Sequence, residues 1–71
     1  MKLPITLRFA FMAGKARAWR DECMRSARDC PDPHLRRQFI WSARAWNHNA
    51  IRNAERARRW YEHDIKAGKA P

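Results

Sequence analysis

The stretch Cys30-Pro31-Asp32-Pro33 decides the fold of this 71-residue chain. Two prolines within three residues end one helix and begin another, because proline lacks a backbone N–H and clashes with the preceding turn of a helix. Asp32 is suited to be an N-cap, and Pro33 at the first helical position has no N–H to leave unpaired. The sequence therefore predicts an all-α protein, an antiparallel two-helix hairpin with helices over about 5–29 and 33–66.

Both predicted helices carry an apolar stripe with spacings of three and four, as a core-facing side requires. The predicted core residues of the first helix are Met12, Ala16, Trp19, Cys23, Ala27 and Cys30. Those of the second helix are Leu35, Phe39, Ala43, Trp46, Ala50, Ala54, Ala57 and Tyr61. The second helix, about 50 Å long at 1.5 Å per residue, is longer than the first. Its last turns are therefore expected to overhang the first helix or to meet another chain.

Residues 4–11 fit two patterns. Ile5, Leu7 and Phe9 alternate as in a strand, whereas Ile5, Phe9 and Met12 extend the helical stripe. We favour the helix because a lone strand has no partner strand in this chain, and it would need the sheet edge of another protein or of a second copy. As a helix, the segment exposes a second apolar strip opposite the hairpin core, which predicts an association surface. This association strip consists of Leu7, Phe11 and Ala18.

The short length of the chain predicts one domain that needs support from outside. Residues 1–71 form a single small helical domain in this interpretation, with a frayed tail at 67–71 that begins at a C-cap-like glycine, Gly68. A core of this size rarely contributes more than about 3–5 kcal/mol to stability. We therefore expect a homodimer, or a hairpin completed by a partner.

The charge of the chain predicts an acidic partner. Sixteen Lys and Arg against seven Asp and Glu give a formal net charge of +9, and twelve of the sixteen cations are Arg. Guanidinium groups bind carboxylate and phosphate in a bidentate way and stack on aromatic rings. A GC-rich genome offers an explanation of the Arg bias that needs no function.

One side of the second helix combines these arginines with tryptophans. We predict partner-binding residues on the side opposite the core stripe, because Arg and Trp dominate the hot spots of binding surfaces. They are Arg37, Trp41, Arg44, His48, Arg52, Arg56, Arg59 and Trp60. The two tryptophans are about 28 Å apart along the helix, which suits an extended surface better than a small pocket. In the alternative interpretation, a dimeric four-helix bundle buries these tryptophans and leaves the arginines solvated.

Two functions fit this surface. The first is a small inhibitor or adaptor that docks on an acidic face of a partner protein, a general character shared by short phage-encoded proteins that disable a host machine. The second is DNA or RNA binding, in which arginines neutralise phosphates and tryptophans stack on unpaired bases. Glu55 and Glu62 interrupt the basic side and would repel phosphate, which slightly favours the first. Their expected role is pairing along the helix with Arg58, Arg59 or Lys66.

Other classes of function find little in the sequence. The chain contains no Ser, His and Asp set and no Gly-rich phosphate loop, so we expect no enzyme activity and no cofactor. Cys30 and His34 are four residues apart, but the remaining Cys and His residues lie at different heights, so we expect no metal site. No segment approaches the roughly 20 apolar residues of a membrane span. A cytoplasmic protein with reduced Cys23 and Cys30 is the expectation, and membrane association is disfavoured.

Overall fold

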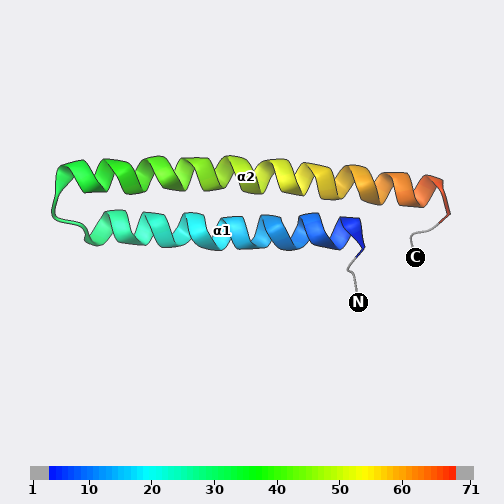
Figure 1. Ribbon diagram of the computed structural model, residues 1–71, viewed down its shortest axis with the longest axis horizontal. Helices are drawn as coiled ribbons and strands as arrows, with labels where there is room; N and C mark the ends of the chain where they lie inside the picture. Colours follow the sequence, from blue (N-terminus) through cyan, green and yellow to red (C-terminus); the bar gives the residue numbers. More distant parts are fainter. Residues whose placement is uncertain (1–3, 69–71) are drawn as a thin grey trace.

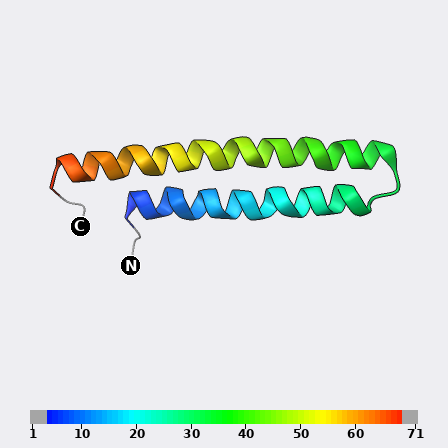
Figure 2. The ribbon, with the colours of Figure 1, turned by 180° about the vertical axis from the view of Figure 1, so that it is seen from behind.

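The computed structural model describes residues 4–68 and consists of two antiparallel helices. α1 spans Ile5–Asp29 and α2 spans Pro33–Lys66, and the two lie side by side along their length (Figures 1 and 2). Residues 4–68 contain no strand, so the predicted all-α hairpin is confirmed. The segment at 5–11 is helical, and the strand alternative for it is wrong.

The turn is held by two local caps. The Asp32 side chain accepts a hydrogen bond from the backbone N–H of His34 at 2.9 Å, which confirms its role as N-cap. The Arg36 guanidinium donates from Nε and Nη2 to the carbonyl oxygen of Cys30, at 3.2 and 2.8 Å. Because the last carbonyls of a helix lack partners within it, this second cap ties the end of α1 to the start of α2.

At the other end of the hairpin, α2 extends past the start of α1, as predicted (Figure 1). Gly68 follows α2 with a φ of 72° and donates its N–H to the carbonyl of Ile65 at 3.0 Å. A positive φ favours glycine, which has no Cβ to clash, so the predicted terminating glycine is confirmed. Residues 69–71 of the predicted tail lie outside the described residues.

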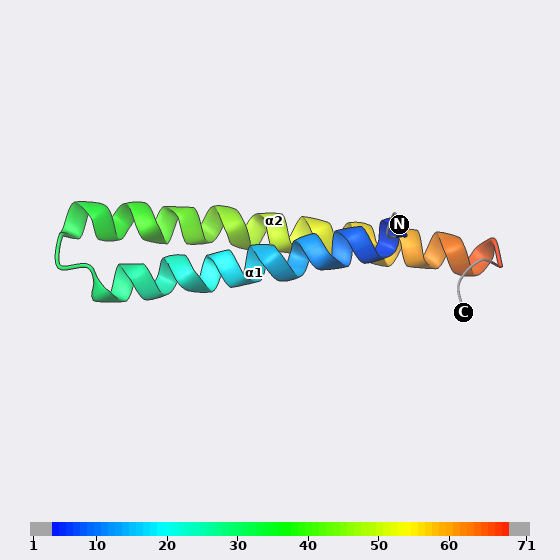
Figure 3. The same ribbon diagram turned by 60° about the horizontal axis from the view of Figure 1, so that its bottom comes forward.

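The helices meet along a line of small side chains. Every buried apolar residue in the described range is an alanine, and these five define the alanine seam: Ala13, Ala16, Ala27, Ala43 and Ala50. Asn53 is the buried polar residue beside them. Since the separation of two packed helices depends on the side chains between them, this seam lets α1 and α2 approach closely along slightly inclined axes (Figure 3).

The predicted core stripes are therefore wrong in their large members. Ala16, Ala27, Ala43 and Ala50 are buried as predicted, and five others are half-buried: Cys23, Cys30, Phe39, Ala54 and Ala57. Apart from Phe39, the large predicted core residues are exposed instead, and these are Met12, Trp19, Leu35, Trp46 and Tyr61. A side chain of that size at the centre of the seam would force the helices apart, so it lies at the edge of the contact.

Polar groups occupy part of the space that these apolar residues were expected to fill. Arg20 and Asn47 are both half-buried. The Nη1 atom of Arg20 donates to Oδ1 of Asn47 at 2.8 Å, and this hydrogen bond joins α1 to α2 beside the seam.

Neither helix, over the described residues, has a stretch long and apolar enough to cross a membrane.

The alanine seam predicts a steep cost for added volume. Ala50→Leu inserts three heavy atoms between the helices and should destabilise the protein by about 1–3 kcal/mol in urea unfolding. Ala45→Leu is the matched control, because Ala45 is exposed on the same helix. Equal unfolding midpoints for the two variants would contradict the close approach of the helices at Ala50.

Candidate binding surface

The side of α2 that points away from α1 carries a continuous row of basic residues. All eight predicted partner-binding residues are exposed, and six of them recur at spacings of three, four and seven, which places these six on one side of the helix. We call this row the outer face of α2, and it comprises Arg37, Trp41, Arg44, His48, Arg52 and Arg59. Glu55 lies within the same row.

The arginines of the outer face have no carboxylate partner among residues 4–68. The ion pairs of this range are Arg20–Asp21, Arg25–Glu22 and His63–Asp64, none of which involves the outer face. The expected pairing of Glu55 and Glu62 along α2 is therefore absent within the described residues. Guanidinium groups without an internal partner are available for carboxylate or phosphate groups of another molecule.

Trp41 is the most exposed large apolar side chain in the described range, at 77%. Arg37 and Arg44 lie four residues before and three residues after it, but neither makes a cation–π contact with it, since the cation–π contacts among residues 4–68 join Lys15 to Phe11 and Arg56 to Phe9. An indole this exposed contributes nothing visible to the packing of the hairpin. It has the character of an anchor that becomes buried only when a partner binds.

Arg56 and Trp60 do not belong to the outer face. The Arg56 guanidinium lies 5.8 Å from the centre of the Phe9 ring, across the hairpin on α1. Trp60 is 38% exposed and lines a shallow hollow with Ile5 and Met12. The predicted basic and aromatic side of α2 is therefore divided between two surfaces.

Sequence spacing contains the signal for this division. Trp60 follows Trp46 by two heptads, so both lie on the same side of a packed helix. Trp41 precedes Trp46 by five residues, which is about 140° around the helix at 100° per residue. The predicted partner-binding side of α2 includes both Trp41 and Trp60, but of these two only Trp41 points away from α1.

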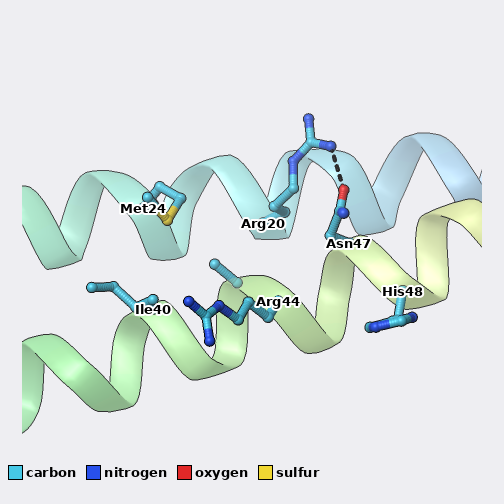
Figure 4. Close-up of a pocket in the computed structure, with 7 residues that line it drawn as sticks. Arg20, Met24, Ile40, Arg44, Asn47 and His48 are labelled. Carbon is cyan, nitrogen blue, oxygen red and sulfur yellow. Dashed lines mark hydrogen bonds between the residues drawn. The ribbon is translucent and has the colours of Figure 1, made fainter.

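A shallow groove adjoins the outer face where α2 packs on α1. It has a volume of about 510 Å³, and its lining residues are Arg20, Met24, Ile40, Ala43, Arg44, Asn47 and His48. Met24 and Ile40 approach it from opposite helices, and the Arg44 side chain runs back along α2 toward Ile40 (Figure 4). The groove therefore brings apolar side chains of both helices next to two side chains of the outer face, Arg44 and His48.

Apolar periodicity does not predict the polar part of this groove. Arg20 continues the spacing of Ala13 and Ala16 along α1, so spacing alone would place it near α2. Its charge argues against such a position. The hydrogen bond to Asn47, together with the contact of Arg20 Nε with Asp21 at 3.0 Å, satisfies the guanidinium there.

The predicted association strip is exposed on the far side of α1. Leu7 and Phe11 are 53% and 60% exposed, and Ala18 is exposed as well. Gly14 falls in the same row, and a Cβ added there would meet no atom within 4 Å. Its role as an association surface stays a prediction.

The described residues bring together no group of three or more His, Cys, Asp or Glu side chains that would hold a metal ion. Cys23 and Cys30 are free and half-buried. The Cys30 thiol donates to the backbone carbonyl of Asp32, with Sγ 3.6 Å from the oxygen. Its contact within the turn is structural.

The four tryptophans provide a test of this geometry. Trp41, Trp19, Trp60 and Trp46 are 77%, 51%, 38% and 37% exposed. Trp41→Phe should therefore lower acrylamide quenching of tryptophan fluorescence more than Trp60→Phe does, because it removes the indole most open to solvent. A larger loss of quenching from Trp60→Phe would contradict the assignment of Trp41 to the outer face.

Comparisons with known proteins place this chain in no family. No family model matches it, and neither a curated protein nor a solved structure shows significant similarity to it. Its function must be inferred from the side chains that its own fold presents.

Proposed function

We propose that this chain is a non-enzymatic binding protein, an inhibitor or adaptor, which docks through the outer face of α2 on an acidic face of a partner protein. The observation that carries this proposal is the 77% exposed Trp41, set in a row of arginines that have no carboxylate partner within residues 4–68. Arg and Trp are the residue types whose truncation most often costs binding energy at protein interfaces. The net charge of +9 would also accelerate encounter with an acidic target.

The groove beside Arg44 supports a protein partner. Its lining combines the apolar side chains of Met24 and Ile40 with the basic side chain of Arg44. Such a groove suits an apolar side chain that is flanked by acidic residues on the partner's surface. A buried anchor surrounded by charged groups is the common arrangement of energetic hot spots.

Nucleic acid is the less favoured partner for the same face. Glu55 lies in the row of basic residues and would repel the nearest phosphate. Because Trp60 lies outside the outer face, Trp41 is the one tryptophan on that face. Proteins that bind single-stranded nucleic acid use several aromatic side chains, on which successive bases stack.

The proposal predicts that a double substitution on the outer face removes partner capture. Trp41→Ala/Arg44→Ala should lose proteins that the wild type retains from a nuclease-treated lysate of its source organism. If Trp41 is an anchor, its truncation alone should cost about 2 kcal/mol, which is roughly a 30-fold loss of affinity for a captured partner. Titration of each variant against that partner by calorimetry measures the loss.

Tyr61→Ala/Arg58→Ala is the matched control, because it removes one aromatic ring and one arginine from exposed positions of α2 outside the outer face. The control should retain capture, with unchanged helix content by circular dichroism. Nuclease treatment that abolishes capture would contradict the proposal. So would tight binding of a single-stranded or duplex oligonucleotide that weakens by orders of magnitude between about 50 and 200 mM salt.

A further inference from the structure

The alanine seam leaves a large apolar surface on the side of the hairpin away from the groove. Three residues of α1 follow one another at intervals of seven, and three residues of α2 lie at multiples of seven. We call these six residues the aromatic flank: Ile5, Met12 and Trp19 of α1, with Phe39, Trp46 and Trp60 of α2. At its middle, the Trp19 and Trp46 rings stack with centroids 6.1 Å apart and planes inclined by 21°.

The aromatic flank remains open to solvent in the single chain. Phe39 is half-buried, and the other five side chains are exposed, including Trp19 at 51% and Met12 at 46%. Two hollows follow the flank, one at Met12, Trp19 and Trp46 and the other at Ile5, Met12 and Trp60. An exposed apolar surface of this extent is typical of an association site.

The surface area of the chain shows how much remains uncovered. The hairpin exposes 6035 Å² at a mass of 8.5 kDa. A compact monomer of that mass exposes about 4,700 Å², so this chain exposes roughly 1,300 Å² in excess. A standard protein interface buries about 800 Å² on each partner. Covering the aromatic flank with one interface of ordinary size would therefore remove most of the excess.

Charge restricts where a second copy of this chain can bind, and the aromatic flank meets that restriction. Two molecules of net charge +9 repel, so they can associate only where each presents an uncharged surface. None of the six residues of the flank is charged. At its rim, Lys15 lies over the Phe11 ring, with Nζ 5.7 Å from the ring centre, and Arg56 lies over Phe9. These two cations are directed to rings of their own chain, and Arg8 lines the hollow at Ile5 and Trp60.

The position of the stacked pair also fits a two-fold contact. Trp19 and Trp46 lie near the middle of α1 and α2, with Phe39 on one side of the pair and Met12 and Trp60 on the other. In an isologous interface the same patch appears on both partners, related by a two-fold axis. An axis through the stacked pair would bring four tryptophans together and place Phe39 of one copy toward Met12 of the other.

We propose that two copies of this chain pack aromatic flank against aromatic flank as an antiparallel four-helix bundle. Large side chains then form the core between the two hairpins, as in other bundles. The outer face of each α2 stays on the surface, so the dimer presents two copies of the basic surface. This proposal is independent of the proposed function, because the flank and the outer face share no residue.

Two variants with the same change of charge test the dimer. Met12→Lys places a cation in the aromatic flank, and Leu7→Lys places one in the association strip nearby on α1. Both side chains are about half exposed. In sedimentation equilibrium from low to high micromolar concentration, the wild type and Leu7→Lys should be dimers, and Met12→Lys should dimerise at least 100-fold more weakly. A monomeric wild type, a dimeric Met12→Lys, or a monomeric Leu7→Lys would overturn the proposal.

A fluorescence measurement keeps the proposal testable if Met12→Lys does not fold. Trp41→Phe retains only tryptophans of the aromatic flank as indole emitters. Its emission maximum should shift to shorter wavelength as the concentration rises from nanomolar, where the chain dissociates, to high micromolar, because Trp19 and Trp46 leave water when the second copy binds. An emission maximum that is constant over the concentration range, with helix content retained, would overturn the proposal.

Discussion

The contact that governs this structure is the close approach of two helices along the alanine seam. Alanine allows that approach because it extends no further than Cβ, and the helices meet with little apolar volume between them. The consequence is unusual for a helical hairpin: the large apolar side chains are displaced from the centre of the contact to its edges. The aromatic flank follows from that displacement. The outer face is the side of α2 that points away from α1.

The ends of the helices could be predicted from the sequence because their causes are local. Pro31 and Pro33 forbid a continuous helix, Asp32 caps the second one, and Gly68 adopts the positive φ that ends it. The depth of each side chain could not be predicted in the same way. Periodicity identifies the side of a helix that faces its partner, but several residues share that side, and only their sizes decide which one reaches the centre.

The candidate site shows the same limit. Trp41 lies on the outer face, as its spacing predicts. Trp60 lies on the same side of α2 as Trp46, because it follows Trp46 by two heptads. The position of Arg20 beside the seam could not be predicted, because it depends on the hydrogen bond that Arg20 donates to Asn47 on the other helix. Apolar patterning carries no information about such polar partners. The outer face and the aromatic flank became distinct only when the position of α1 around α2 was known.

The central claim is that the hairpin is incomplete until a second copy covers its aromatic flank. Thermal unfolding followed by circular dichroism tests it most directly, because the stability of a dimer whose folding and association are coupled depends on protein concentration. The account predicts that the unfolding midpoint of the wild type rises steadily from low to high micromolar concentration. A midpoint that is independent of concentration over this range would contradict it.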